Sequence, residues 1–414
     1  MADKRKIKIK VEDLTLIFGK RKQEALALLE KGISKEEILK KTKCTVGVNK
    51  VNFEIKEGEI FVIMGLSGSG KSTLIRCLNR LINPTAGKVF FKDHDITRES
   101  NKELLETRRT EMSMVFQKFG LLPHRTILEN AAFGLEIRGE EKLVREERAI
   151  QALETVGLKG YEHQYPSAMS GGMQQRVGLA RALANDPEVL LMDEAFSALD
   201  PLIKSDMQDE LLEIQNKLHK TIVFITHDLD EAIKIGDRIA IMKDGVIEQI
   251  GTAEEILTGP ASEYVEAFVE KVDRKTIITA ETLMFKKNTL VQMPKDGPGV
   301  SIRKMRSIGV DVLPVEDENR KFLGYVWLQD LLELEKDKEI SVKKALKPNV
   351  PSVYKTYTVE DMLPLITGIK YPLAVIDEET GKLLGLISQT SLIIEATRFG
   401  KKEISELKEQ ANDM

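Results

Sequence analysis

Short apolar runs alternate with amphipathic stretches through the first 250 residues of the chain. Residues 6–18 alternate apolar and polar side chains and predict an edge strand, and residues 51–56 and 59–64 predict two more strands. Five further runs predict strands separated by helical patterns: VFF, SMVF, VLLMD, TIVFIT and RIAIMK. Such alternation is typical of a largely parallel sheet covered by helices. The pattern therefore predicts an α/β domain.

Helical periodicity fills the stretches between these strands. Residues 22–43 predict two short helices, and Ser34 with Glu37 three positions later predicts a capping box for the second. Further helices are expected around residues 127–137 and 142–156. The pair at 22–43 lies between two predicted strands.

A charged stretch with Gly and Pro follows, and we place a domain boundary near residue 272. Beyond it the segments from Val312 and from Pro372 resemble each other, about 60 residues apart. The matched pairs are Val315 with Val375, Asp317 with Asp377, and Gly324 with Gly385 after one inserted residue. Each unit predicts a strand, an acidic turn, a strand and a helix. We therefore expect an α+β domain over residues 273–400, with repeats at about 280–340 and 341–400 and a polar tail at 401–414.

Composition places the chain among ordinary globular proteins. Its 414 residues are 42% hydrophobic and 31% charged, and the net charge of −4 gives no support to nucleic-acid binding. Cys44 and Cys77 fit neither a zinc site nor a disulfide framework, so we expect buried thiols of a reducing compartment. The basic N-terminus lacks an apolar signal core, and the apolar runs are too short to span a membrane. We expect a soluble cytoplasmic protein that reaches a membrane only through a partner.

The stretch FVIMGLSGSGKSTLIRCLNR, residues 61–80, holds the pattern G-x-x-x-x-G-K-S/T between a predicted strand and a predicted helix. Glycines let backbone N–H groups wrap a phosphate without Cβ clashes, and the helix N-terminus adds a favourable dipole. Lys71 would neutralise β- and γ-phosphate oxygens, and the hydroxyl of Ser72 would bind Mg²⁺. The alternative is a Gly/Ser turn that merely joins strand to helix, and the complete motif disfavours it. The predicted phosphate-binding residues are Gly65, Ser67, Gly68, Ser69, Gly70, Lys71, Ser72 and Thr73.

Polar side chains follow three of the predicted strands, at the end where a parallel sheet gathers its ligands. Asp193 and Glu194 close VLLMDEA; Asp193 would hold Mg²⁺ directly or through water, and Glu194 would orient and deprotonate the attacking water. His227 follows TIVFIT, where it would donate to a γ-phosphate, and Gln117 follows SMVF, where it would sense Mg²⁺ or water. Alone, each residue has a structural alternative, such as an acidic turn or a core histidine. Beside the phosphate loop they predict a hydrolytic site.

A second Gly-rich helix start occurs in MSGGMQQRVGLARAL, residues 169–183. Ser170, Gly171 and Gly172 precede a helix with apolar periodicity, and a helix N-terminus favours an anion. Because Lys71 already supplies one phosphate site per chain, this second site suggests that two chains pair and share each nucleotide. The alternative is an ordinary Ser cap with a Gly-rich lead-in.

Taken in order, these motifs resemble those of the ATP-binding cassette (ABC) ATPases over about residues 6–250. The resemblance implies a phosphate-loop ATPase domain with a mixed sheet core and a helical subdomain, and ATP and Mg²⁺ as ligands. It implies that Gln117 is the Q-loop residue, Asp200 the D-loop aspartate and His227 the switch histidine. Phe18 would stack on the adenine, since LTLIFGK resembles the strand end that carries that aromatic residue. The implied Mg²⁺ contacts are Ser72, Gln117 and Asp193.

Two departures narrow the resemblance. Where the usual signature is L-S-G-G-Q, residues 169–173 of this chain are M-S-G-G-M. The Gln that contacts the partner's nucleotide is therefore replaced by Met173, although Gln174 is adjacent. The segment 22–43 is inserted between Phe18 and the strand at 51. These two features, and a tail whose repeats resemble a tandem pair of CBS modules, are similar to the glycine betaine/proline betaine importer ATPases.

The resemblance implies the energy-coupling subunit of a binding-protein-dependent importer of glycine betaine or other compatible solutes, active in osmoprotection and regulated through its CBS modules. Its partners would be a second copy of the chain, an integral membrane permease docked near residues 118–138 and an extracellular substrate-binding protein. The ATPase would lie at the cytoplasmic face of the cell membrane. Import of choline, carnitine, proline or methionine stays open, as do a soluble ABC ATPase of DNA repair or translation and a non-catalytic CBS adaptor.

The CBS resemblance implies an adenine-nucleotide site. The family pattern places a small hydroxyl residue three positions before an aspartate, and each repeat keeps half of it: Trp327 and Asp330 in the first, Ser388 and Ser391 in the second. We interpret this as a degraded mononucleotide site. A cyclic dinucleotide bound across a dimer in an apolar cleft is the sharper hypothesis, and a purely structural dimerisation module is the alternative. The candidate walls of the cleft are Tyr371, Val375 and Ile387.

Overall fold

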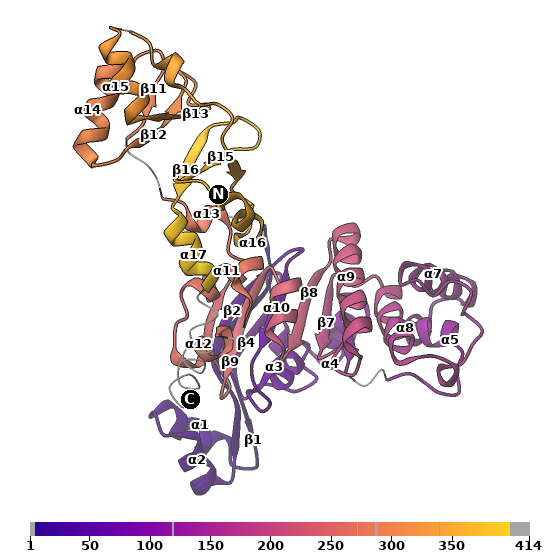
Figure 1. Cartoon of the computed structure of the whole chain (residues 1–414). Coiled ribbons are helices and arrows are strands. Elements are labelled where there is room, and N and C mark those ends of the chain that lie inside the picture. The colour runs from indigo at the N-terminus through magenta and orange to yellow at the C-terminus, as the bar shows by residue number, and fades with distance from the viewer. Residues whose placement is uncertain (1–4, 118–119, 271, 286–288, 339, 398–414) are drawn as a thin grey trace, which may run out of the picture. The chain divides into compact units, whose positions relative to one another are not determined.

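The computed structural model describes residues 5–117, 120–270, 272–285, 289–338 and 340–397 (Figure 1). The chain forms two compact units, Met1–Val269 and Glu270–Met414. The predicted tail at 401–414 lies outside the described residues. Every helix in the described ranges is too short or too polar to cross a lipid bilayer.

A four-stranded antiparallel sheet opens the first unit. Its strands are β2 (Thr45–Lys56), β1 (Ile7–Phe18), β4 (Ala86–Phe91) and β5 (His94–Asp95), in that order. β1 pairs with β2 on one side and β4 on the other, so the prediction of an edge strand at 6–18 is wrong. Its alternating side chains mark the two faces of an antiparallel sheet, and not a free edge.

The core of the first unit is a six-stranded sheet in the order β10-β9-β3-β8-β7-β6. All neighbours pair in parallel except β10, which is antiparallel to β9. β3, β7 and β8 are buried along their whole length, as their unbroken apolar runs require. The predicted largely parallel sheet is confirmed. The strands are β3 (Ile60–Met64), β6 (Met112–Phe116), β7 (Val189–Asp193), β8 (Thr221–Thr226), β9 (Arg238–Lys243) and β10 (Val246–Gly251).

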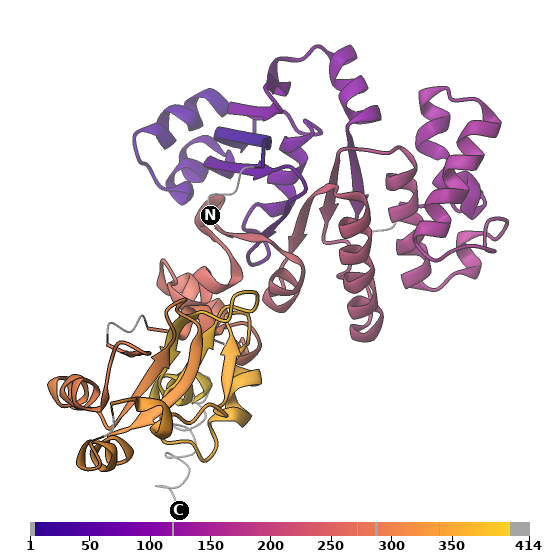
Figure 2. The same cartoon turned by 90° about the horizontal axis from the view of Figure 1, so that it is seen from above.

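Helices pack around this core, and those between residues 127 and 184 form a layer of their own (magenta in Figure 2). That layer holds α5 (Ile127–Ala131), α6 (Phe133–Arg138), α7 (Lys142–Thr155), η2 (Pro166–Ala168) and α8 (Gly171–Ala184). The other helices of the unit are α3 (Lys71–Leu78), η1 (Ile96–Arg98), α4 (Asn101–Thr110), α9 (Pro201–Leu218), α10 (Leu229–Ile235), α11 (Ala253–Thr258) and α12 (Glu263–Val269). The helical layer agrees with the predicted helical subdomain.

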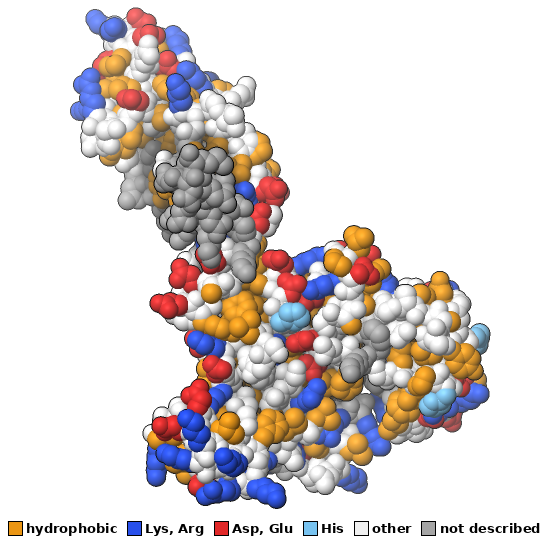
Figure 3. Space-filling model, turned by 60° about the horizontal axis from the view of Figure 1, so that its bottom comes forward, with side chains coloured by type: hydrophobic (Ala, Val, Ile, Leu, Met, Phe, Trp, Pro, Cys, Tyr) orange, Lys and Arg blue, Asp and Glu red, His pale blue; other side chains and the backbone are white. Residues whose placement is uncertain are grey.

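The inserted pair is α1 (Lys22–Glu30) and α2 (Lys35–Thr42). Ser34 caps α2 by accepting a hydrogen bond from the backbone N–H of Glu37 at 3.3 Å, which is half of the predicted capping box. A small apolar cluster holds the pair against the ends of β1 and β2. The two helices carry four Lys and four Glu side chains, and Lys/Arg and Asp/Glu surface is mixed at the lower left of Figure 3.

The second unit contains two three-stranded sheets with the same topology. β11 (Val291–Gln292), β12 (Val312–Glu316) and β13 (Phe322–Trp327) form one, and β14 (Ser352–Tyr354), β15 (Leu373–Ile376) and β16 (Leu383–Ile387) the other. In each, the first pair of strands is parallel and the second antiparallel. The helices are η3 (Arg274–Thr276), α13 (Ala280–Leu283), α14 (Pro298–Ile308), α15 (Leu328–Lys336), η4 (Val342–Ala345), α16 (Val359–Met362), η5 (Leu363–Ile366) and α17 (Gln389–Thr397).

The matched residues of the repeat occupy equivalent places in these sheets. Val315 pairs with Gly324 and Val375 pairs with Gly385, and a register shift follows each pair. Asp317 accepts hydrogen bonds within the turn that follows β12, and Asp377 does the same after β15. The predicted repeat of strand, acidic turn, strand and helix is therefore confirmed.

Candidate functional site

The phosphate loop joins β3 to α3 and depends on its glycines. Gly65 and Gly70 have φ values of +152° and +103°. A Cβ on Gly65 would lie 2.2 Å from the carbonyl oxygen of Met242, and one on Gly70 would lie 2.5 Å from that of Gly47. Side chains cannot be accommodated at such distances, so the loop keeps this shape only with glycine at both positions.

Polar atoms inside the loop fit a polyphosphate. The ammonium of Lys71 donates to the carbonyl oxygens of Gly65 (2.8 Å) and Leu66 (3.2 Å), and the side chain is 5% exposed. Burial lowers the pKa of Lys71, against the opposing effect of nearby carboxylates, so an added anion would stabilise its charge. The hydroxyl of Ser69 is buried and has no hydrogen-bond partner within the described part of the chain. An unpaired buried hydroxyl beside a buried ammonium favours an anionic ligand.

Ser72 and Asp193 provide the oxygens that a Mg²⁺ ion would need. The hydroxyl of Ser72 donates to Oδ1 of Asp193 at 2.7 Å, which leaves its lone pairs free for a cation. Arg76, one turn further along α3, donates to Oδ2 of Asp193 at 3.2 Å. The buried carboxylate of Asp193 is thus fixed from both sides. Sequence reasoning missed Arg76; its spacing of four residues from Ser72 on one helix was the available signal.

Glu194 lies where the predicted catalytic residues meet. Its carboxylate is 3.7 Å from the ammonium of Lys71, 3.3 Å from the amide nitrogen of Gln117 and 3.7 Å from Nδ1 of His227. The three neighbours come from α3, from the end of β6 and from the end of β8. Glu194 itself has a φ of +47°, directly after β7. The carboxyl ends of three parallel strands therefore bring one carboxylate and its predicted partners together.

The signature segment lies at the start of α8. Ser170 caps this helix and accepts a hydrogen bond from the N–H of Met173 at 3.3 Å. Gln174 donates to the carbonyl oxygens of Pro166 and Met169, both at 3.1 Å, so its amide is used within its own chain. It therefore does not replace the missing signature glutamine in this conformation.

The predicted D-loop aspartate, Asp200, likewise caps a helix. Asp200 caps α9 by accepting a hydrogen bond from the N–H of Ile203 at 3.1 Å. A Cβ on Gly172 would lie 2.6 Å from Cγ2 of Ile203, so the starts of α8 and α9 are in close contact.

Phe18 lies at the end of β1 and is 41% exposed. Its ring edge would lie 2.9 Å from a Cβ on Gly47, and the methyl group of Thr73 would lie 3.3 Å from the same point. Phe18 and the first turn of α3 thus flank one glycine of β2.

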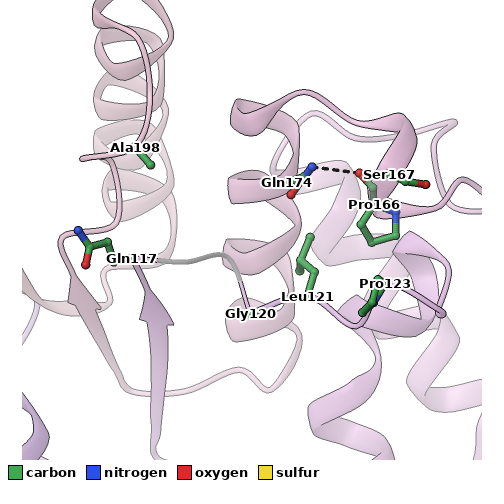
Figure 4. A pocket seen from close by; sticks show the side chains of 8 residues that line it. All are labelled: Gln117, Gly120, Leu121, Pro123, Pro166, Ser167, Gln174 and Ala198. Atoms are coloured by element: carbon green, nitrogen blue, oxygen red, sulfur yellow. Dashed lines mark hydrogen bonds between the residues drawn. The ribbon is translucent and has the colours of Figure 1, made fainter.

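A hollow of about 490 Å³ separates the sheet edge from the helical layer (Figure 4). Gln117 and Ala198 line it from the side of the sheet, and the other residues come from the helical side. It is lined by Gln117, Gly120, Leu121, Pro123, Pro166, Ser167, Gln174 and Ala198. The predicted Q-loop residue therefore borders both the carboxylate of Glu194 and the helical layer.

The predicted CBS residues lie at the start of the last helix of each repeat. Ser388 and Ser391 share a hydrogen bond of 2.7 Å, and Asp330 pairs with the ammonium of Lys347 at 2.9 Å. That ammonium also lies 4.6 Å from the ring centroid of Trp327. The residues predicted as apolar walls differ in exposure: Tyr371 is half-buried in an aromatic cluster with Tyr325 and Trp327, whereas Val375 and Ile387 are fully buried.

Comparison with known protein families agrees with this geometry. A family model described as ABC transporter matches residues 48–197, and one described as CBS domain matches residues 342–397. A solved dimeric structure of a bacterial ABC transporter cassette is 32% identical, with a TM-score of 0.51, and covers 59% of this chain and 98% of that one. A dimeric cassette in a post-hydrolysis state bound to ADP and Pi is also 32% identical, with a TM-score of 0.50 and the same coverage. The predicted fold class is confirmed.

Three similar proteins extend over nearly the whole chain. The glycine betaine/carnitine transport ATP-binding protein GbuA of Listeria monocytogenes is 53% identical over 93% of this chain and 96% of its own length. The glycine betaine transport ATP-binding protein OpuAA of Bacillus subtilis is 51% identical over 94% and 93%. The glycine betaine/proline betaine transport system ATP-binding protein ProV of Escherichia coli is 45% identical over 95% and 98%. The chain is therefore an ABC-type ATPase and belongs to the family of ATP-binding subunits of glycine betaine ABC transporters.

Proposed function

We propose that this chain hydrolyses ATP to drive the import of glycine betaine and related compatible solutes. ATP hydrolysis is supported by the contacts of Glu194 at one edge of the sheet. Its carboxylate lies close to Lys71, Gln117 and His227. The names of three relatives, each matched over most of its length, support the solute. One of those names also includes carnitine, which keeps carnitine as the second candidate cargo.

Each residue of the site has a proposed role in hydrolysis. Lys71 and the loop N–H groups hold the β- and γ-phosphates, while Phe18 stacks on the adenine. Ser72, Asp193 and Gln117 hold Mg²⁺, which neutralises charge on the phosphates. Glu194 accepts the proton of the attacking water, and His227 donates a hydrogen bond to the γ-phosphate. A positioned general base contributes roughly 10²–10⁴-fold to the rate.

The active form is proposed to be a dimer of two copies. Ser170, Gly171 and Gly172 start a helix whose N-terminal N–H groups would contact the nucleotide held by the partner. Asp200 at the start of α9 would lie in the same interface. ATP favours the closed dimer because its phosphates contact both chains only there, which is the differential affinity that a population shift requires.

A membrane permease is the proposed partner of the helical layer, which would place the chain at the cytoplasmic face of the cell membrane. Leu81 and Phe116 are large apolar side chains that are 48% and 39% exposed. They border a second hollow, of about 240 Å³, together with Phe133 of the segment near 118–138. Residues 118–119 lie outside the described residues. Arg108 and Arg181 also line this recess, so it would accept apolar side chains of a short permease helix beside a polar rim. An extracellular substrate-binding protein would complete the importer.

The CBS repeats are proposed to regulate transport in osmoprotection. A cyclic dinucleotide of adenine across two copies is the ligand we favour, with a purely structural dimer contact as the alternative. The half-buried rings of Trp327 and Tyr371 and the ammonium of Lys347 support a ligand with aromatic rings and negative charge. Calorimetric titration of a full-length Lys71 variant with cyclic di-AMP tests this; the absence of heat would favour the structural alternative.

The substitution Glu194→Gln tests the central proposal. It keeps the shape of the side chain but removes the base, so we expect ATP to bind and to drive dimerisation while turnover falls by at least about 100-fold. Nucleotide binding, dimer formation by size-exclusion chromatography and phosphate release are measured on the same preparation. Unchanged phosphate release would remove Glu194 from its proposed role. Copurification of the chain with its permease, followed by solute-uptake assays, tests the cargo.

A further inference from the structure

The side chain of His227 makes few contacts that could hold it in place. His227 follows β8 and precedes α10, and its side chain is 58% exposed. Among the described residues its ring has one charged neighbour, the carboxylate of Glu194 at 3.7 Å. The position of the imidazole therefore depends on the backbone of the two residues that flank it, Thr226 and Asp228.

Both flanking side chains belong to one hydrogen-bonded network. The hydroxyl of Thr226 accepts a hydrogen bond from the N–H of Asp228 at 3.0 Å and donates to the carboxylate of Glu231. One oxygen of Asp228 accepts from the N–H groups of Asp230 (3.0 Å) and Glu231 (3.3 Å), which caps α10. The turn beneath His227 is thus closed by Thr226, Asp228 and Glu231.

Lys204 of α9 neutralises this network. Its ammonium lies 2.6 Å from the free oxygen of Asp228 and 3.5 Å from Glu231, whose side chain is 4% exposed. Gln208, one turn further on, donates to the other oxygen of Glu231 at 3.2 Å. Burial opposes the charge of Lys204, yet the two carboxylates outweigh it and raise the pKa of the ammonium. Burial also raises the pKa of Asp228, but the pairing with Lys204 prevails and lowers it.

We propose that Lys204 is a positioning residue for hydrolysis: its ammonium holds Asp228 and Glu231 so that the turn between β8 and α10 directs His227 toward Glu194. This inference rests on the proposed function, because it assigns to His227 a role in ATP turnover. Lys204 lies one turn after Asp200, so the helix that begins at the D-loop also fixes the switch histidine. Without Lys204, the partly exposed carboxylate of Asp228 and the nearly buried one of Glu231 would lose the ammonium that pairs with both, and neighbouring carboxylates either take up a proton or separate.

A second ion pair between the same helices provides a matched control. Lys234 of α10 lies 2.7 Å from Asp209 of α9, with side chains that are 34% and 60% exposed. This pair also joins α9 to α10 but lies toward the far end of α10 from His227. If ion pairing between the two helices mattered only for stability, loss of either pair would have a similar effect on turnover.

The experiment compares Lys204→Met, Lys204→Arg and Lys234→Met in the full-length chain. We expect Lys204→Met to lower kcat between about 10- and 100-fold, with KM for ATP changed less than about twofold, because the histidine is misplaced but the phosphate loop is not. Lys204→Arg should restore most of the turnover, and Lys234→Met should leave it unchanged. Should Lys204→Met fail to fold, Asp228→Asn breaks the same pair and must give the same loss of kcat.

A double-mutant cycle with His227→Ala separates positioning from general damage. If Lys204 acts through His227, Lys204→Met causes no further loss of kcat in the His227→Ala background. An equal loss in both backgrounds, or a kcat of Lys204→Met within about twofold of the parent, would overturn the proposal. Different results refute the two proposals. If Glu194→Gln leaves turnover unchanged, the proposed function is refuted. If Lys204→Met leaves turnover unchanged, only this inference is refuted.

Discussion

The hydroxyl of Ser72 is bonded to Asp193 and is also the proposed ligand of Mg²⁺. It donates its proton to Asp193 at 2.7 Å, and its lone pairs point away from that bond and remain available to a cation. Mg²⁺ is bound in such sites by one or two protein oxygens together with phosphate oxygens and water. The hydrogen bond to Asp193 therefore fixes the direction of the lone pairs before any metal arrives.

Ser72→Ala removes the proposed metal contact and leaves the loop glycines and Lys71 in place. We expect ATP to bind in the absence of Mg²⁺ about as well as it does to the parent chain. The Mg²⁺ concentration needed for half-maximal turnover should rise by about tenfold, the equivalent of about 1.4 kcal/mol of lost binding. A Mg²⁺ titration of phosphate release measures this. Ser72→Thr keeps the hydroxyl and serves as the control; equal Mg²⁺ requirements for both variants would contradict the assignment.

Residues of the site differ in how far the sequence predicts them. Gly65 and Lys71 lie at fixed spacings within one loop, and Glu194 directly follows a buried strand, so local patterns are sufficient. Arg76 and Lys204 lie on helix faces where a charged residue usually contacts only water. Their roles depend on Asp193 and Asp228, which the fold brings to them from distant parts of the chain. No local pattern contains that information.

At the scale of whole elements, the antiparallel sheet is tied to the parallel sheet by a buried cation. Lys8 of β1 is largely buried and pairs with Glu57 at 2.9 Å and with Glu188 at 2.8 Å. Glu188 directly precedes β7, and it also accepts from Lys92 at 2.9 Å. A lysine in an alternating strand predicts a solvent-facing position, but here a carboxylate from the neighbouring sheet covers it. This contact explains why Lys8 is buried in a strand whose pattern predicts a solvent-facing lysine.

Glu188→Gln should lower the free energy of unfolding of the first unit by about 1 kcal/mol at neutral pH. The expected loss is small because the carboxylate is 41% exposed and solvent screens its ion pairs. Burial acts to raise the pKa of Glu188, but Lys8 and Lys92 outweigh it and lower it. A lowered carboxyl pKa stabilises the fold above the unfolded-state value and loses that effect as the pH falls through the folded-state value. Urea unfolding of both chains at pH 7 and at about pH 3.5 should show a difference that shrinks in acid.

Glu213→Gln is the control for this measurement, because Glu213 pairs with Lys217 on an exposed face of α9, with both side chains 72% exposed. We expect it to change stability by less than about 0.5 kcal/mol at either pH. A Glu188→Gln effect that stays constant between the two pH values would mean that the charge of Glu188 is not what links the two sheets.

Over the whole molecule, the chain combines an ATPase unit with a unit built twice from one pattern. The repeat could be predicted because Val315 and Val375, and Gly324 and Gly385, occupy the same register in their sheets. The way in which the two repeats join could not, because it depends on a residue outside the matched pairs. Tyr325 of β13 is completely buried, and its hydroxyl donates to the carbonyl oxygen of Pro372 at 2.6 Å.

Tyr325 therefore offers a test of how the second unit is held together. Its ring also packs against Tyr371, with the ring centroids 5.1 Å apart, so it joins the first repeat to the second by a hydrogen bond and by aromatic contact. Tyr325→Phe removes only the hydrogen bond and should destabilise the second unit by about 1 kcal/mol. Tyr325→Ala also removes the ring and should cost about 3–5 kcal/mol, while ATP turnover by the first unit persists. Limited proteolysis of the full-length chain, with sites mapped to each unit, measures both effects.

Tyr357→Phe is the matched control, because its hydroxyl has no hydrogen-bond partner among the described residues. If Tyr325→Ala and Tyr357→Phe were cleaved at the same rate, the repeats would have to be joined by other contacts.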